Sequence, residues 1–124
     1  MKIAQHLFAD SGHANTTSAP TVIPIDRHYE FHYMNILFFS DEAMEDKHHI
    51  HTKDMAGTIH VECTDNRLEW VSVANGDIVL GQFDGYARPN IQGNYLAVRV
   101  DLSDVTDFNG ATHFKFSVNS NERV

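Results

Sequence analysis

Histidines are the residues of this chain whose type and spacing could do chemistry. There are nine of them in 124 residues, and three stand almost together at His48, His49 and His51. Imidazole is the commonest transition-metal ligand, and on a strand His49 and His51 would point to the same side. The carboxylates of Asp46 and Asp54 lie near in the sequence. One hypothesis is therefore a metal site at these three histidines, and a pH response is a softer alternative.

The spacing of these histidines matches no closed zinc motif, and no cysteine pair supports it. We therefore expect no cofactor, and we interpret Asp41 to Ala56 as a charged loop in which histidine is merely polar. Cys63 is the one cysteine of the chain, so no disulfide can form within it. Its place on the apolar side of a strand indicates a buried small side chain rather than a reactive thiol.

The sequence shows no motif of a known catalytic class. It lacks a G-x-S-x-G elbow, a glycine-rich phosphate loop and an H-E-x-x-H pair. Carboxylate pairs such as Asp41-Glu42 stand in the charged loop, where such pairs usually face solvent. We therefore predict that the protein is not an enzyme.

The charge of the chain excludes some classes of partner. Seventeen acidic residues against nine basic ones give a net charge of -8, which argues against nucleic acid and against an anionic membrane surface. No stretch is long and apolar enough to span a membrane, and the first residues do not read as a signal peptide. We therefore expect the chain to be made and folded in a cytoplasm.

The elements that must position these side chains are short strands. In the stretch from Gly57 to Gly76, apolar and polar residues alternate from Thr58 to Thr64, which is typical of a half-buried strand. A second strand follows from Leu68 to Val73, and Asn75-Gly76 is a strong signal for a tight turn. We therefore expect a hairpin that ends at this Asn-Gly pair.

Further strands follow the same alternation. With turn signals at roughly ten-residue spacing, they predict a single all-β domain over residues 25–120, an antiparallel β-sandwich of jelly-roll-like type. In His28 to Ser40 the continuous apolar run at its end suggests burial on both faces, or a bulge. The other candidates are Thr21 to Ile25, Asp77 to Phe83, Asn94 to Leu102 and Thr112 to Val118.

The two ends of the chain differ from this pattern. Residues 1–24 are rich in Ser, Thr and Ala and read as an extended N-terminal arm, and residues 121–124 read as a polar tail. Ile3, Leu7 and Phe8 would be unusual in a purely solvated segment. The arm is therefore either a disordered tail or a segment that lies on a neighbouring subunit.

Aromatic residues suggest a different function. Trp70, Tyr86 and Tyr95 could stack on sugar rings if they are exposed, as in carbohydrate-binding β-sandwiches. A lone tryptophan in a small sandwich more often belongs to the core, which is where we expect Trp70.

Several stretches resemble small β-sandwich virion proteins of tailed bacteriophages. The resemblance is carried by the segments Phe39 to Asp41, Gly57 to Glu62, Trp70, Asn75-Gly76, Arg99 to Val105 and Gly110 to Lys115. The histidine-rich segment from Asp46 to Asp54 is not part of it.

The resemblance implies a structural protein of the virion, most simply a capsid decoration (cement) protein. Its partners would be the major capsid protein or other virion subunits, and it would form a homo-oligomer, with a trimer favoured. The virion would be assembled in the cytoplasm of a bacterial host. The alternatives are a carbohydrate-binding module of a tail or fibre appendage and a histidine-rich metal-binding domain. Candidate interface residues are Ile3, Leu7 and Phe8 of the arm. Tyr86, Arg88 and Ile91, in a predicted loop from Tyr86 to Ile91, are further candidates.

Overall fold

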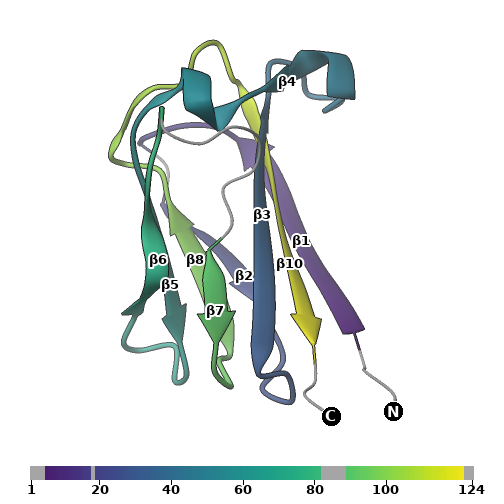
Figure 1. Ribbon diagram of the computed structural model, residues 1–124, viewed down its shortest axis with the longest axis vertical. Coiled ribbons are helices and arrows are strands. Elements are labelled where there is room, and N and C mark those ends of the chain that lie inside the picture. Colours follow the sequence, from purple (N-terminus) through teal and green to yellow (C-terminus); the bar gives the residue numbers. More distant parts are fainter. Residues whose placement is uncertain (1–4, 18, 82–88, 122–124) are drawn as a thin grey trace.

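The computed structural model describes residues 5–17, 19–81 and 89–121 of the chain. They form two antiparallel five-stranded sheets that face each other as a sandwich, with two single-turn 3-10 helices in the connections (Figure 1). The all-β sandwich expected from the alternating sequence is therefore confirmed. None of the described helical turns is long or apolar enough to cross a membrane.

Sheet A takes strands from both ends of the chain. Its order is β1-β10-β3-β4, and β7 pairs with β3 as well. β4 pairs with Phe38 and Phe39, whereas β7 pairs with the segment from Phe31 to Tyr33 at the other end of β3. The strands are β1 (Gln5–His13), β3 (Phe31–Phe39), β4 (His49–Ile50), β7 (Asn90–Gln92) and β10 (His113–Asn121).

Sheet B is built around β5 and has the order β2-β8-β5-β6. A further short strand, β9, pairs with β5 at Ala56 and Gly57. The strands are β2 (Thr21–Pro24), β5 (Ala56–Thr64), β6 (Val71–Val79), β8 (Ala97–Asp101) and β9 (Val105–Asp107).

The core lies between the two sheets and follows the period-two alternation. On β10 every second residue from Phe114 to Ser120 is buried, and on β3 every second residue from His32 to Phe38 is buried. Phe39, the next residue of β3, is also buried although it points to the opposite face. The apolar run at the end of this strand therefore reflects burial on both faces, with no interruption of its pairing to β10.

Two polar side chains that bond each other, His32 and Ser120, are fully enclosed in this core. His32 on β3 has no exposed surface, and its Nδ1 lies 2.6 Å from the Ser120 hydroxyl oxygen. Its Nε2 lies 2.9 Å from the carbonyl oxygen of Gly93. A carbonyl can only accept, so Nε2 carries the proton and Nδ1 accepts from Ser120. Burial lowers the pKa of His32, which keeps the ring neutral.

The expected hairpin exists, but it does not end at Asn75-Gly76. β6 continues through this pair to Val79, and its register against β5 shifts between His60 and Glu62. The pair therefore belongs to a β-bulge, where a Cβ on Gly76 would lie 2.5 Å from the carbonyl oxygen of Val61. The turn prediction was wrong because a close backbone approach also selects glycine.

The boundary expected at residue 24 is also wrong. β1 pairs with β10 along all nine of its residues, and β2 pairs with β8. Residues 5–13 and 21–24 are therefore edge strands of the two sheets rather than an arm outside the sandwich. At the other end β10 includes Asn121, and residues 122–124 of the expected tail lie outside the described part of the chain.

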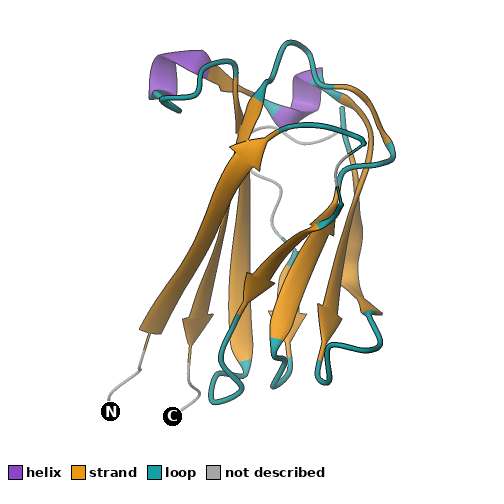
Figure 2. Cartoon of the chain, turned by 180° about the vertical axis from the view of Figure 1, so that it is seen from behind, coloured by secondary structure: helices purple, strands orange, loops and turns teal. Residues whose placement is uncertain are grey.

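The sandwich has two distinct poles. β1 begins and β10 ends at one pole, while η1 (Asp46–His48), β4 and η2 (Thr52–Asp54) lie at the opposite pole (Figures 1 and 2). The histidine-rich segment thus connects β3 of sheet A to β5 of sheet B through two helical turns and one short strand.

Candidate functional site

Two of the predicted interface residues lie on β1. Leu7 is opposite Asn119 of β10, and Phe8 is opposite Val118. Ile3, the third residue predicted from the arm, lies outside the described residues. The edge of sheet A thus holds the backbone of this segment in place.

Of the three loop residues predicted at the interface, the structure describes only Ile91. Ile91 lies on β7 opposite His32 and is only 1% exposed, so it belongs to the core. Its prediction as an interface residue is wrong, because the pairing of β7 with β3 turns this side chain between the sheets. Tyr86 and Arg88 lie outside the described residues.

β1 forms a free edge of sheet A among the described strands. The Ala14 N–H donates to the Thr112 carbonyl oxygen over 2.9 Å. Such a bond flanks a non-hydrogen-bonded pair, which here is His13 and His113. The backbone N–H and C=O groups of His13 therefore point away from β10.

The same alternation fixes the direction of the other β1 groups. The N–H groups of Ala9 and Ser11 point to the free edge, whereas that of Asp10 points to β10. The Ser11 N–H accordingly donates to Oδ1 of Asp10, at 2.8 Å, rather than to a strand. The backbone groups of every second residue of β1 thus face the free edge. Among them, the Ser11 N–H is already bonded to the Asp10 carboxylate.

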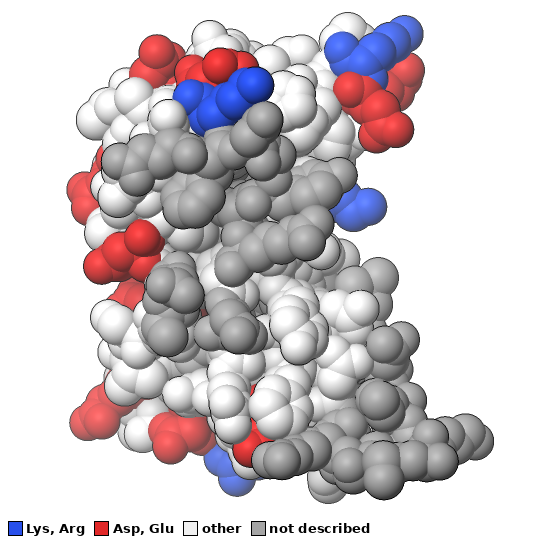
Figure 3. Space-filling view, viewed as in Figure 1, with Lys and Arg blue, Asp and Glu red and all other residues white. Residues whose placement is uncertain are grey.

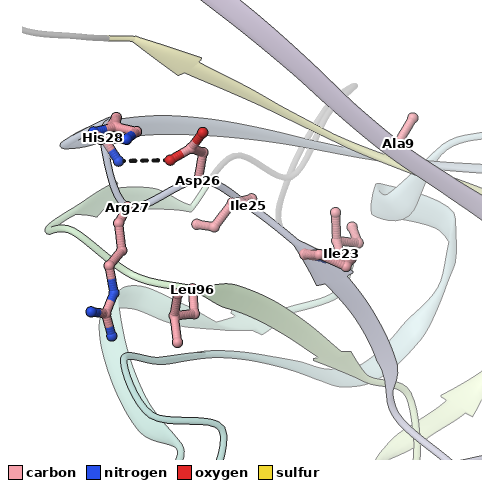
Figure 4. Close-up of a pocket in the computed structure, with 8 residues that line it drawn as sticks. Ala9, Ile23, Ile25, Asp26, Arg27, His28 and Leu96 are labelled. Carbon is pink, nitrogen blue, oxygen red and sulfur yellow. Dashed lines mark hydrogen bonds between the residues drawn. The ribbon is translucent and has the colours of Figure 1, made fainter.

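A groove of about 770 Å³ lies between the edge strands β1 and β2. Its apolar lining comes from Ala9, Ile23, Ile25 and Leu96, and residues 26–28 add polar groups. Figure 4 shows Ala9 on β1 across from the isoleucines of β2 and the segment that follows it. The free edge of sheet A is therefore bordered by apolar surface.

The three loop histidines do not converge on one point. His48 pairs with Asp41, with 3.5 Å between Nε2 and Oδ2. His49 instead packs its ring against Phe39, with centroids 5.6 Å apart, and against His51, with centroids 4.7 Å apart. Burial and the proximity of His51 lower the pKa of His49. His48 therefore has surroundings of its own, separate from the His49–His51 contact.

The structure brings another histidine pair together on the same face of sheet A. His13 on β1 lies opposite His113 on β10, and their ring centroids are 4.6 Å apart. His113 lies opposite Phe39, which in turn lies opposite His49. Four strands thus contribute one row across the sheet, with Phe39 between two imidazole groups.

Within the described residues, no group of three or more His, Cys, Asp or Glu side chains has an arrangement that could hold a metal ion. The hypothesis of a three-histidine site at His48, His49 and His51 thus has no support from the geometry. Within the described residues, histidine rings contact each other at His13–His113 and at His49–His51.

On the outer face of sheet B, His60 is held between two carboxylates. Its Nδ1 lies 2.8 Å from Oδ1 of Asp77, and its Nε2 lies 2.5 Å from Oδ2 of Asp104. Both ring nitrogens can donate only when the imidazole is charged. The hydrogen bonds to Asp77 and then to Asp104 raise the pKa of His60. His60 thus links β5 to β6 and to the turn after β8.

Acidic side chains exceed basic ones over the surface. Figure 3 shows them along the margin beside β5 and β6, with few lysines and arginines on the same face. This distribution fits the net charge of -8. A cation would be attracted to the surface, and an anionic polymer would be repelled.

Trp70 is half-buried rather than part of the core, so this prediction is wrong. The guanidinium of Arg99 lies 4.6 Å from the centroid of its ring. Arg99 in turn forms an ion pair with Glu62, at 2.8 Å between Nη2 and Oε1. Because the arginine covers one face of the indole, only the other could stack on a sugar. Tyr95 is also half-buried and packs on the core.

The sequence offered a partial signal for the His13–His113 pair. Alternation within Thr112 to Val118 predicts that His113 faces outward, as it does. His13 was missed because its segment reads as an arm, and only the pairing of β1 with β10 places it beside His113.

Comparison with known proteins leaves the function open. No protein-family model and no curated protein matches this chain. A solved structure described as "Bacillus endospore appendages form a novel family of disulfide-linked pili" superposes with a TM-score of 0.49 and 11% identity. The match covers 98% of this chain and 89% of that chain. A likeness at this level carries no argument about function.

Proposed function

We propose that this chain is a structural subunit of a virion, of the capsid decoration kind, and that it binds neighbouring copies of itself through the free edge of β1. The observation that carries the proposal is this edge, which is nine residues long and regularly paired on one side only among the described strands. The sequence resemblance to β-sandwich virion proteins supports the same role.

The edge of β1 is suited to strand addition. Its sequence, QHLFADSGH, contains no proline or lysine, the residues that commonly block the pairing of edge strands. Asp10 is its one acidic residue, and its carboxylate covers the Ser11 N–H. A strand from a neighbouring copy would bond the outward groups of β1, including those of Ala9 and His13.

The groove beside the edge extends the contact surface. A stable interface buries roughly 1,200–2,000 Å² in total, which is more than one added strand supplies. Apolar side chains of the neighbour would enter the groove beside Ala9, Pro24 and Leu96, behind which lie the buried Ile23 and Ile25. Main-chain bonds would then fix the register, and burial in the groove would supply affinity.

A pair of variants at Ala9 tests this role without removing a strand. Proline at position 9 lacks an N–H on the free side of β1 and leaves the bonds to β10 in place. Ala9→Val keeps the N–H and changes the same side chain. Light scattering is expected to give a mass above 14.0 kDa for the wild-type chain and for Ala9→Val, and the monomer mass for Ala9→Pro.

Mass spectrometry of virions produced by the cells that encode the chain tests the first half of the proposal, the role in a virion. We expect the chain to be present in many copies per particle. Particles that lack it would refute the virion role. A wild-type chain that stays monomeric at all concentrations, or an Ala9→Pro variant that assembles normally, would refute the role of the β1 edge.

A further inference from the structure

We propose that His13 and His113 form a binding site for a divalent late transition metal, such as Zn²⁺, that fastens the edge strand β1 to β10. Imidazole nitrogen is a preferred ligand of Zn²⁺, Ni²⁺ and Cu²⁺. The inference is independent of the assembly role proposed above.

The backbone places the two rings at the closest kind of cross-strand position. His13 and His113 are directly opposite, and the bond from Ala14 N–H to the Thr112 carbonyl makes them a non-hydrogen-bonded pair. Side chains at such pairs are closer than at hydrogen-bonded pairs. The ring centroids are 4.6 Å apart with a tilt of 44°. Because His13 is exposed, its ring can turn so that one nitrogen of each imidazole meets the same ion.

A hydroxyl group selects the nitrogen that would bind the metal. Oγ1 of Thr112 lies 2.9 Å from Nδ1 of His113. Histidines that bind metals commonly donate their second ring N–H to an oxygen atom, which fixes the orientation and the tautomer. With Nδ1 donating to Thr112, Nε2 of His113 presents its lone pair to the ion.

The charges around the pair are mixed. Lys115 lies two residues along β10 on the same face, about 7 Å away by strand geometry. Lys115, Asp10 and Asp46 line one groove of about 520 Å³ on this side of sheet A. Across the pair, His113 lies opposite Phe39, and beyond it is the imidazole of His49. Lys115 shares this groove with Asp46, whereas Asp10 lies opposite the buried Phe116 and so belongs to the other face of sheet A.

The other histidine contact, between His49 and His51, is less suited to holding a metal ion. His49 and His51 have centroids 4.7 Å apart, but His49 belongs to a strand of only two residues, and His51 lies between that strand and a helical turn. His49 also packs on Phe39, which ties up one side of its ring. His13 and His113 instead stand on two nine-residue strands in continuous register. Rigid supports of this kind favour a defined metal geometry. Two protein ligands would be completed by water molecules.

Thermal unfolding with Zn²⁺ alone and with added chelator tests the site on the full chain. We expect saturating Zn²⁺ to raise the melting temperature of the wild-type protein by about 5 °C, because it binds the folded state preferentially. His113→Gln should reduce this shift to about 1 °C or less. His51→Gln, which removes the competing contact, should keep the full shift. The shift should also disappear at pH 5, because a metal-binding imidazole must be neutral.

Nuclear magnetic resonance of the imidazole nitrogens gives a readout that does not depend on stability. On addition of Zn²⁺ we expect Nε2 of His113 to show the shift of a metal-bound nitrogen, while Nδ1 stays protonated. The proposal is refuted if Zn²⁺ leaves the His113 nitrogens unchanged. It is also refuted if His113→Gln keeps the thermal shift, or if His51→Gln abolishes it.

Discussion

The replacement of His32 by glutamine alters the one histidine that is fully enclosed among the described residues. Its ring bonds the Ser120 hydroxyl at 2.6 Å and the Gly93 carbonyl at 2.9 Å. A glutamine amide offers a donor and an acceptor but cannot reproduce both directions of a rigid ring. At pH 8 we expect the free energy of unfolding to fall by about 1–3 kcal/mol, which is the range for buried polar groups that lose a partner.

The pH dependence of this difference isolates the protonation of the ring. Burial lowers the pKa of His32 in the folded state, so the unfolded chain binds the proton at a higher pH than the folded one. Stability from His32 is therefore complete above the unfolded pKa of about 6.5 and is lost as pH falls below it. Between pH 7.5 and 5.5 the advantage of the wild-type chain over His32→Gln should shrink by at most about 1.4 kcal/mol.

Urea unfolding followed by the fluorescence of Trp70 measures both chains at each pH. His28→Gln is the matched control, because His28 is exposed and its replacement should give a curve parallel to that of the wild-type chain. A constant or widening difference between wild type and His32→Gln in acid would refute the reasoning. So would a magnetic resonance titration in which the His32 ring of the folded protein takes up its proton at or above the unfolded pKa of about 6.5.

Three further outcomes follow from the geometry. Hydrogen bonds to Asp77 and Asp104 raise the pKa of His60, so its stabilisation is complete in acid and lost as pH rises through the folded pKa; urea unfolding should show wild type and His60→Gln converging at alkaline pH. Gly57→Ala should cost more than about 2 kcal/mol in urea unfolding, because φ is +107° and a Cβ would lie 2.4 Å from the Asp104 carbonyl oxygen. Burial raises the pKa of Cys63 to about 12, so a thiol reagent should label it only after the protein unfolds; rapid labelling of the native chain would contradict its burial.

The strands of this sandwich are predictable wherever one face is buried. On β10 the apolar residues Phe114, Phe116 and Val118 alternate with polar ones, and all three are buried. β1 lacks this signal because its sequence mixes Ser, Gly and His, and its conformation depends on pairing with β10 at the other end of the chain. The intrinsic strand propensity of such a sequence is weak, and its pairing with another strand determines its conformation.

The candidate sites could likewise be predicted only among residues that are close together in sequence. The loop histidines are close together in sequence, which predicts a shared site, yet His48 pairs with Asp41 and does not join the others. His13 and His113 are distant in sequence and become neighbours only through sheet register. Spacing along a chain predicts contacts within one strand or helix, whereas contacts across a sheet require the strand order.

The position of β10 between β1 and β3 also determines when the protein can fold. Chains emerge from the ribosome N-terminus first, at about 5–20 residues per second, so the central strand of sheet A is among the last parts to appear. Until then β1 has no strand to pair with, and β3 lacks its neighbour along the whole of its length. Because pairing between distant segments is slow, sheet A should close only after synthesis of the domain is complete. Until sheet A closes, β1 and β3 therefore expose strand edges of the kind that is prone to aggregation.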